Sequence, residues 1–455
     1  MTTETVHPVR AWEADVYRFL EQTTVPPAVR EHGERVVADV LAAMVAGSTV
    51  DSVDAVGRTA AFSAGPATAL GSGRRLDPGQ AALVNATAGI AQEVEEGHNE
   101  GGHVGTSVVA GALALGETAD VDGETFVDAC VKAYEVVVRL EYAIFAMKAE
   151  LSEATEWVIR DPHSTWTTVG PALAGALCRG LTDDALRNAF RTAANLAVVS
   201  MHDPYEEGAP SRNFTAGFSA QAGTTVPLVA EAGVTGAESG VTDVYDPLRD
   251  LLDDGEFDRL FAELGETWEI RRNYFKPYPS CRYTHPALDA LVDLPEDVDA
   301  ADVERVDVYT FGNAVAMNHQ SPETFTSAKF SIPYVLARQL VSGAVAFEHF
   351  TSDAIAEDSV QALADRVFVH TDAEFEDRFP TEWGARVAVT VDGRTVSAVR
   401  RVPRGDHADP LSEAALSRKF ERCCALALDD AERATTVLDA PASHSVATIA
   451  DALSD

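Results

Sequence analysis

His103 stands among glycines, in a segment that carries glutamates shortly before it. Residues 92–105 read QEVEEGHNEGGHVG. The glycines leave the backbone free to present an imidazole in a loop, and nearby carboxylates raise the pKa of such a ring. The pattern predicts an acid/base histidine, with a solvated acidic loop as the alternative. We do not expect a metal site, because the Glu and His spacing matches no tight metal motif.

A second segment, residues 160–166, reads RDPHSTW and precedes an expected helix. Pro162 prevents a helix from running through the segment. The N-terminus of the next helix would offer unpaired N–H groups and a positive dipole end to an anion. His163 is therefore a candidate acid, base or carboxylate ligand. The alternative is that Asp161 and Ser164 simply cap the helix and His163 has no role.

Two basic residues are candidates for holding carboxylates. Arg212 stands at the start of a helix rich in small residues, and its guanidinium can hold a carboxylate with two parallel hydrogen bonds. Lys276 lies among aromatic residues and prolines in 274–285, YFKPYPSCRYTH. Burial there would lower the lysine pKa and make it usable as a general acid or base. The alternatives are a surface ion pair for Arg212 and an ordered domain connector around Lys276.

Several common catalytic motifs are absent. Gly71-Ser72-Gly73 is followed by Arg74-Arg75 rather than by the rest of a dinucleotide-binding fingerprint. No phosphate-binding loop with its lysine occurs, and no G-x-S-x-G nucleophile elbow. The sequence therefore disfavours NAD-dependent, ATP-dependent and serine-hydrolase chemistry, and we expect no cofactor.

Charge and cysteine content limit the partners and the compartment. The 455 residues include 72 acidic and 35 basic residues, for a net charge of −37, and only five lysines. This balance is typical of a halophilic surface, and it disfavours nucleic acid and anionic membranes as partners. The five cysteines do not suggest a disulfide framework. With no apolar signal core and no apolar run of about 18 residues, we expect a cytoplasmic protein without a membrane span.

Apolar periodicity predicts helices first, then a mixed region, then helices again. The helices are expected at 28–47, 78–94, 106–116, 124–142, 166–179, 183–199 and 215–232. Strands are expected at 304–312, 365–372, 385–391 and 394–401, with helices at 330–343 and near 351–363. Asp392-Gly393 predicts a tight hairpin between the last two strands. Further helices are expected from Pro410 to about residue 429 and near 443–453.

These elements predict a mainly α fold with an α+β part. A large all-helical domain would be formed by residues 1–270 and 406–455, with a smaller α+β domain, residues 271–405, inserted between them.

Taken in order, these segments resemble the MmgE/PrpD family, of which 2-methylcitrate dehydratase is a member. The matching segments are 80–85, 93–105, 134–140, 163–174, 212–217, 230–236, 275–285, 328–331 and 403–406. Each segment is weak evidence alone, but their joint order and spacing along nearly the whole chain are specific.

The resemblance implies a two-domain enzyme, usually a homodimer, with its active site between the domains and no iron–sulfur cluster or metal. The family dehydrates 2-methylcitrate, decarboxylates cis-aconitate or epimerises iminodisuccinate. Each reaction transfers a proton at a carbon beside carboxylates. The resemblance therefore implies a small di- or tricarboxylate as substrate.

Position by position, His103 matches the histidine of the family's H-P-G motif, with Val104 in place of the proline. Lys276 matches the lysine of its K-P-Y-P-like motif, and Arg212 falls where members carry lysine or arginine. Glu93 and Glu96 fall where many members carry aspartates. The second histidine of the family aligns with His163 or with Asp161.

The expected function is a lyase of the 2-methylcitrate dehydratase type. Arg212, Lys276 and Arg282 would neutralise the substrate carboxylates in a locally positive pocket, with Glu93 and Glu96 also binding substrate. His103 or His163 would remove a proton alpha to a carboxylate, and the other histidine, Lys276 or Asp161 would serve as its acid/base partner. A dicarboxylate epimerase, a cis-aconitate-type decarboxylase and a non-catalytic carboxylate-binding protein are the alternatives.

Overall fold

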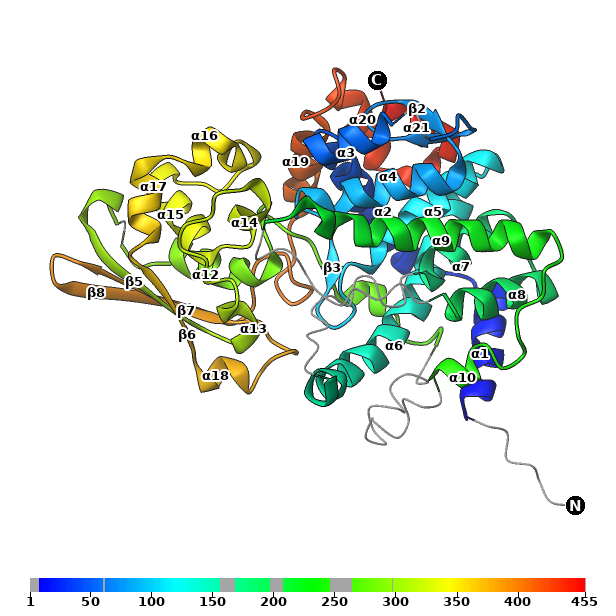
Figure 1. Cartoon of the computed structure of the whole chain (residues 1–455), viewed down its shortest axis with the longest axis horizontal. Helices are drawn as coiled ribbons and strands as arrows, with labels where there is room; N and C mark the ends of the chain where they lie inside the picture. Colours follow the sequence, from blue (N-terminus) through cyan, green and yellow to red (C-terminus); the bar gives the residue numbers. More distant parts are fainter. Residues whose placement is uncertain are drawn as a thin grey trace, which may run out of the picture.

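The computed structural model describes residues 8–59, 62–155, 168–196, 208–245, 264–296 and 298–454, with the backbone alone for residue 8 and for 143–155. The molecule is mainly helical with a small amount of β structure, as predicted. In Figure 1 a body of helices lies on the right and a mixed body of helices and strands on the left. The division into domains at residues 270 and 405 stays a prediction.

The helical body draws on both ends of the described chain. Its first elements are α1 (Pro8–Gln22), α2 (Pro27–Gly47), α3 (Asp51–Gly57), β1 (Ala67–Ala69), β2 (Arg74–Leu76), α4 (Pro78–Ala91), β3 (Gly97–His98), α5 (Val104–Thr118), α6 (Gly123–Thr155), α7 (Val169–Cys178), α8 (Asp183–Ala194), α9 (Phe214–Glu231) and α10 (Thr242–Tyr245). Its last elements are α19 (Glu413–Cys424), α20 (Ala431–Leu438) and α21 (Val446–Ala452). One hydrophobic core contains side chains from both groups.

Small residues allow the central helices of this body to pack closely. Helix α4 packs against α2 and α9, and α5 packs against α7. A Cβ added to Gly47 would lie 1.8 Å from the carbonyl oxygen of Ala88, so α2 and α4 meet backbone to backbone. Helix α19 returns from the mixed body to pack on α2, where the Lys419 ammonium bonds the buried carboxylate of Asp39. The C-terminal helices therefore complete the first core.

The mixed body has its own hydrophobic core and one four-stranded sheet. Its main elements are α12 (His285–Val292), β5 (Val303–Thr310), α13 (Gly312–Val315), α14 (Phe325–Lys329), α15 (Ile332–Ser342), α16 (Ser352–Ile355), α17 (Asp358–Ala364), β6 (Val367–Thr371), α18 (Ala373–Glu376), β7 (Ala385–Val391) and β8 (Arg394–Arg400). The strand order is β6-β5-β7-β8, with β5 and β6 parallel and the other pairs antiparallel.

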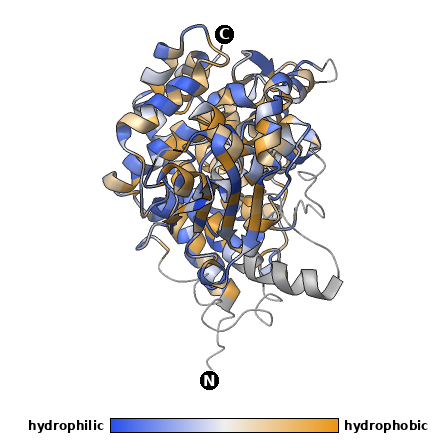
Figure 2. Cartoon of the chain, turned by 90° about the vertical axis from the view of Figure 1, so that its left-hand side faces the viewer, coloured by the Kyte–Doolittle hydropathy of each residue, from blue (hydrophilic) through white to orange (hydrophobic). Residues whose placement is uncertain are grey.

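Alternating residues of the sheet form one wall of this second core. Val387 and Val389 of β7 are fully buried while their neighbours are partly exposed, and α12 and α15 pack on the sheet. Figure 2 shows hydrophilic and hydrophobic residues mixed along these elements. The hairpin predicted at Asp392-Gly393 is confirmed, with φ of 49° and 69° at its two turn residues.

A two-stranded sheet links the two bodies, and its first strand, β3, is labelled near the centre of Figure 1. Strand β3 pairs antiparallel with β4 (Asn273–Tyr274), so that Gly97 faces Tyr274 and His98 faces Asn273. The side chain of Tyr274 belongs to the second core, whereas that of the next residue, Phe275, belongs to the first. The pairing brings the segment around His103 beside the segment around Lys276.

Most predicted elements are confirmed with shifted ends. The expected helix 78–94 ends earlier, at Ala91, and the expected helix 351–363 is two helices, α16 and α17. Of the predictions at 166–179 and 183–199, residues 166–167 and 197–199 lie outside the described residues.

Within the described ranges, no single helix combines the length and the apolar composition of a membrane span. Helices α2 and α3 meet that test only jointly, and their axes differ by 89° at the break between them.

Candidate active site

The segment that carries His103 is shaped by a left-handed residue. Helix α4 ends at Ala91, and Glu93 then adopts a φ of +53°. This conformation costs a non-glycine residue roughly 1–2 kcal/mol, so the contacts of the Glu93 carboxylate must offset it. A closed turn follows, in which His98 and Gly102 exchange backbone hydrogen bonds of 2.8 and 2.9 Å. His103 comes next and is the N-cap residue of α5.

Five side chains meet at the junction of the two bodies, and we call them the junction cluster: Glu93, Glu95, His103, Arg212 and Lys276. The Lys276 ammonium donates to Glu93 Oε2 at 2.9 Å and to Glu95 Oε1 at 3.1 Å. His103 Nδ1 lies 2.8 Å from the same Glu95 oxygen. The Arg212 guanidinium donates to the other oxygen of Glu93. Each charged group of the cluster therefore contacts at least one group of opposite sign or an imidazole.

The junction cluster is enclosed by protein. The side chains of Lys276 and Glu95 are fully buried, those of Glu93 and Arg212 are 3% exposed, and that of His103 is 9% exposed. The imidazole is therefore the most exposed member of the junction cluster. Strand pairing holds the Lys276 side of the cluster, while η2 (Pro210–Asn213), at the start of α9, holds Arg212.

Ion pairing decides the charge states in the junction cluster. Burial alone would raise the pKa of Glu93, but Arg212 and Lys276 lower it below its usual value. The pKa of Glu95 is likewise lowered, because Lys276 and His103 outweigh the effect of burial. Burial would lower the pKa of Lys276, but Glu93 and Glu95 reverse the sign and raise it. The prediction of a lowered lysine pKa is therefore wrong, and Lys276 acts as a fixed cation.

Glu96, proposed from the sequence as a substrate-binding residue, has its carboxyl group outside the junction cluster. It accepts hydrogen bonds from the Tyr134 hydroxyl at 3.1 Å, the Asn273 amide at 3.3 Å and the Gly105 N–H at 3.2 Å. Burial and the neighbouring Asp39 raise its pKa to about 8. The carboxyl group is thus largely protonated at neutral pH, and its contacts fix the segment behind His103.

Glu95 is the cluster residue that sequence reasoning missed. It stands two positions from Glu93 in a segment of bends where Glu93 itself is left-handed, so no regular periodicity relates the two side chains. Only the folded structure shows that Glu95, and not Glu96, contacts Lys276 and His103. One oxygen of Glu95, Oε2, is buried without a hydrogen-bond partner among the described residues.

Arg282 is buried but contacts groups outside the junction cluster. Its guanidinium donates to the Arg404 carbonyl at 2.9 Å, lies 4.5 Å from the centre of the Tyr274 ring and is 3.9 Å from Asp406. Burial lowers its pKa. Through these contacts Arg282 holds the turn at 403–406 next to β4. The candidates His163 and Asp161 lie outside the described residues, so their roles stay predictions.

Three members of the junction cluster have the atoms to ligate a metal. One oxygen of Glu93, one of Glu95 and one ring nitrogen of His103 all lie within 4.8 Å of one another. However, Lys276 already donates to both carboxylates, so an ammonium takes the place of a metal cation. The donor set therefore fits a lysine better than a metal, and the expectation of a metal-free site stays a prediction.

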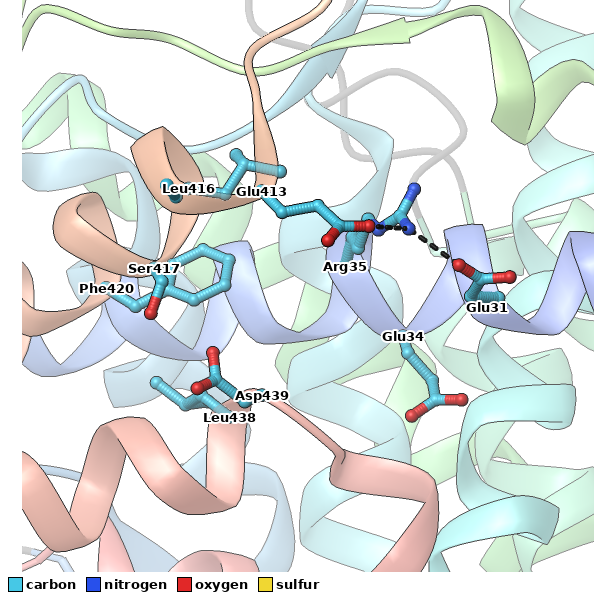
Figure 3. Close-up of a pocket in the computed structure, with 10 residues that line it drawn as sticks. Glu31, Glu34, Arg35, Glu413, Leu416, Ser417, Phe420, Leu438 and Asp439 are labelled. Carbon is cyan, nitrogen blue, oxygen red and sulfur yellow. Dashed lines mark hydrogen bonds and ion pairs between the residues drawn. The ribbon is translucent and has the colours of Figure 1, made fainter.

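A surface cavity of about 440 Å³ lies between α2, α19 and α20 (Figure 3). Its charged lining is mostly acidic, including Glu34 and Asp439, and its Arg35 is bonded to Glu31 at 2.7 Å and to Glu413 at 3.0 Å. An acidic lining repels polycarboxylates. This cavity shares no residue with the junction cluster and does not fit the expected substrate.

Comparison with known proteins identifies the family. Residues 14–258 match the MmgE/PrpD N-terminal domain, and residues 278–440 match the MmgE/PrpD C-terminal domain. The chain is 25% identical to the cis-aconitate decarboxylase-like protein oryM of Aspergillus oryzae, over 90% of this chain and 89% of that protein. It is 23% identical to cis-aconitate decarboxylase of Aspergillus terreus, over 91% of this chain and 89% of that protein. The chain belongs to the MmgE/PrpD family.

Proposed function

We propose that the chain is a cofactor-independent lyase that acts on a small tricarboxylate at the junction cluster. Decarboxylation of a cis-aconitate-like substrate is the first candidate reaction, because similar proteins over nine tenths of the chain carry that name. The observation that carries the proposal is the position of an imidazole 2.8 Å from a carboxylate that also holds a buried lysine.

The two cations would bind substrate carboxylates and stabilise developing negative charge. An ammonium has three N–H donors, and Glu93 and Glu95 use two of those on Lys276. Among the described residues the third has no hydrogen-bond partner, and it would bind a substrate carboxylate. Arg212 is fixed by Glu93, so both cations are held in place before the substrate arrives. Preorganised charges of this kind stabilise a transition state without reorganisation during the reaction.

His103 would transfer the proton. Because Glu95 accepts at Nδ1, the neutral ring carries its proton on Nδ1 and presents Nε2 to the substrate. In decarboxylation, the C–C bond breaks, its electron pair remains on carbon, and carbon dioxide leaves. The imidazolium form of His103 then gives the Nε2 proton to that carbon. Such a proton transfer contributes a rate factor of roughly 10²–10⁴.

Dehydration of a 2-methylcitrate-like substrate is the second candidate. The same His103–Glu95 pair can act in the opposite direction, with neutral Nε2 accepting the proton alpha to a carboxylate. The electron pair then forms the double bond as hydroxide leaves with a proton from a second acid. Residues 161 and 163 are the sequence-based candidates for that acid.

Proton NMR in deuterated water separates these reactions. Purified protein would be incubated, across a series of salt concentrations, with cis-aconitate, 2-methylcitrate, citrate and iminodisuccinate separately. Decarboxylation produces carbon dioxide and a product with one deuteron on carbon, whereas dehydration produces an alkene and water. Deuterium exchange without other change would support an epimerase instead. Binding without any exchange would reject the lyase proposal in favour of a carboxylate-binding protein.

A further inference from the structure

Lys329, the last residue of α14, is a second buried lysine beside the junction cluster. Its side chain is 1% exposed. Its ammonium donates to the carbonyl oxygens of Gln92 and Pro279, at 2.9 Å each. Gln92 immediately precedes Glu93 in the helical body, and Pro279 lies three residues after Lys276. One ammonium therefore joins the two chain segments that carry the central ion pair of the cluster.

The backbone of Lys329 adds a further link to the same segment. Its carbonyl oxygen accepts the N–H of Cys281 at 2.9 Å. The side chain and the backbone of Lys329 thus both bind residues 279–281. These residues are thereby linked to α14 and, through the ammonium, to Gln92. The helical body and the mixed body are joined at this point by hydrogen bonds alone, without a carboxylate partner for Lys329 among the described residues.

The surroundings of the Lys329 ammonium affect its charge in both directions. It lies 4.0 Å from the centre of the Phe350 ring and 4.7 Å from that of Phe325, at distances typical of cation–π contacts. The nearby charged groups are Glu93 and Glu95, which favour its charge, and Lys276, which opposes it. Burial is the largest influence and lowers its pKa to about 7.

Lys329 also contributes to the net charge around the junction cluster. The two carboxylates of the cluster balance Lys276 and Arg212, so these four groups carry no net charge. A protonated Lys329 adds one positive charge to this sum, as does His103 when its ring is protonated. An anionic substrate gains from the positive state through Coulomb attraction in a buried setting.

We propose that Lys329 is a positioning residue for the lyase reaction, which holds the Glu93 and Lys276 segments together and adds the positive charge that favours a bound polycarboxylate. The proposal rests on the proposed function for its kinetic part. Its structural part concerns only the link between residues 92 and 279 and does not depend on turnover.

The test compares Lys329→Met with Lys132→Met. Lys132 is a matched control, because its ammonium also donates to a backbone carbonyl, that of Leu20 at 2.8 Å, but it lies outside the junction cluster. Hydrogen exchange, followed by mass spectrometry, measures backbone opening without any need for activity. In Lys329→Met we expect at least about tenfold faster exchange in peptides covering 92–96 and 279–283. Lys132→Met should leave both regions unchanged.

The kinetic arm measures KM and kcat for the substrate that the wild-type protein turns over, from pH 6 to 9. In the wild-type protein KM should rise as Lys329 loses its proton near pH 7, whereas Lys329→Met should show a high KM without that rise. If Lys329→Met does not fold, Lys329→Gln is measured in the same way.

Unchanged exchange in both segments, or a pH profile of KM identical to that of the wild type, would overturn the positioning role. Failure of both variants to fold would also reject it, in favour of a general folding role. If the wild-type protein turns over none of the substrates, the proposed lyase function fails, but the exchange experiment still decides the structural link.

Discussion

The two bodies contribute different chemistry to the junction cluster. The helical body supplies both carboxylates, the imidazole and Arg212, whereas the segment that follows β4 supplies Lys276. Buried alone, Glu93 and Glu95 would be two adjacent anions with one guanidinium, and burial opposes their charge. Lys276 donates to both carboxylates and supplies the second positive charge. The comparison teaches that neither body holds the complete cluster, and that the charge states of its groups depend on both bodies.

Lys276→Met, which removes the contribution of the second body to the cluster, has the largest expected effect. Removing one partner of a buried ion pair leaves an uncompensated charge, which lowers the free energy of unfolding by about 3 kcal/mol. Activity should fall by about 10³-fold or more, because the cation that stabilises the transition state is lost. Urea unfolding and steady-state kinetics measure the two effects.

Arg191→Met is the matched control, since Arg191 of α8 pairs at 2.7 Å with the buried Glu13 of α1, on the side of the helical body away from β3 (Figure 1). It should lose a similar amount of stability but keep its activity per folded molecule. Equal losses of activity in both variants would mean that Lys276 matters only for folding.

His103→Gln removes the proton carrier of the helical body and leaves the cations in place. We expect kcat to fall by about 10³-fold while the affinity for substrate, measured by calorimetry, changes little. His370→Gln is the control, because His370 also lies 2.8 Å from a carboxylate, that of Asp307, but in the sheet of the mixed body. A fall in kcat below tenfold would remove His103 from the mechanism.

Glu96→Gln tests how the protonated carboxyl group of Glu96 differs from the ionised carboxylates of Glu93 and Glu95. The folded protein holds a proton on Glu96 up to about pH 8, while the unfolded chain loses it near pH 4.5. The folded state therefore binds more protons in that window, and its stability falls as pH rises, by about 1.4 kcal/mol per pH unit.

The glutamine variant lacks this loss, so its stability should exceed that of the wild type increasingly from pH 6 to 8. Glu432→Gln, at an exposed position of α20, should follow the wild-type curve. If the free energy of unfolding depends on pH in the same way in all three proteins, Glu96 is ionised in the folded state.

Treatment with EDTA has the smallest expected effect. Because Lys276 already bonds both carboxylates, we expect a change in activity of less than about twofold. The measurement is repeated after addition of zinc, magnesium or manganese. Loss of activity with EDTA that a single metal restores would replace the ammonium assignment by a metal site.

Local patterns predicted the elements better than the site. The hairpin at Asp392-Gly393 and the buried helices rich in small residues follow from nearby residues alone. The left-handed turn at Glu93, just past the end of α4, does not, because the partners of its carboxylate, Arg212 and Lys276, are more than a hundred residues away in the sequence.

The charge states depend on the same distant contacts. The sequence predicted that burial would dominate at Lys276, but two carboxylates reverse the direction of the pKa change. Conversely, Lys329 stood in a family-like segment without an assigned role, and only its contacts with Gln92 and Pro279 reveal one. No regular periodicity in the bends at 93–96 distinguishes Glu95, and the residues around position 163 stay predictions.

The scarcity of lysine has a practical consequence. Each of the four lysines whose side chains are described turns its amine inward: Lys132 to a carbonyl, Lys276 to two glutamates, Lys329 to two carbonyls and Lys419 to an aspartate. Acylating dyes, biotin esters and lysine-directed crosslinkers need an accessible, uncharged amine. Such reagents will couple poorly to these four positions, and rapid coupling at any of them reports that the surrounding structure has opened.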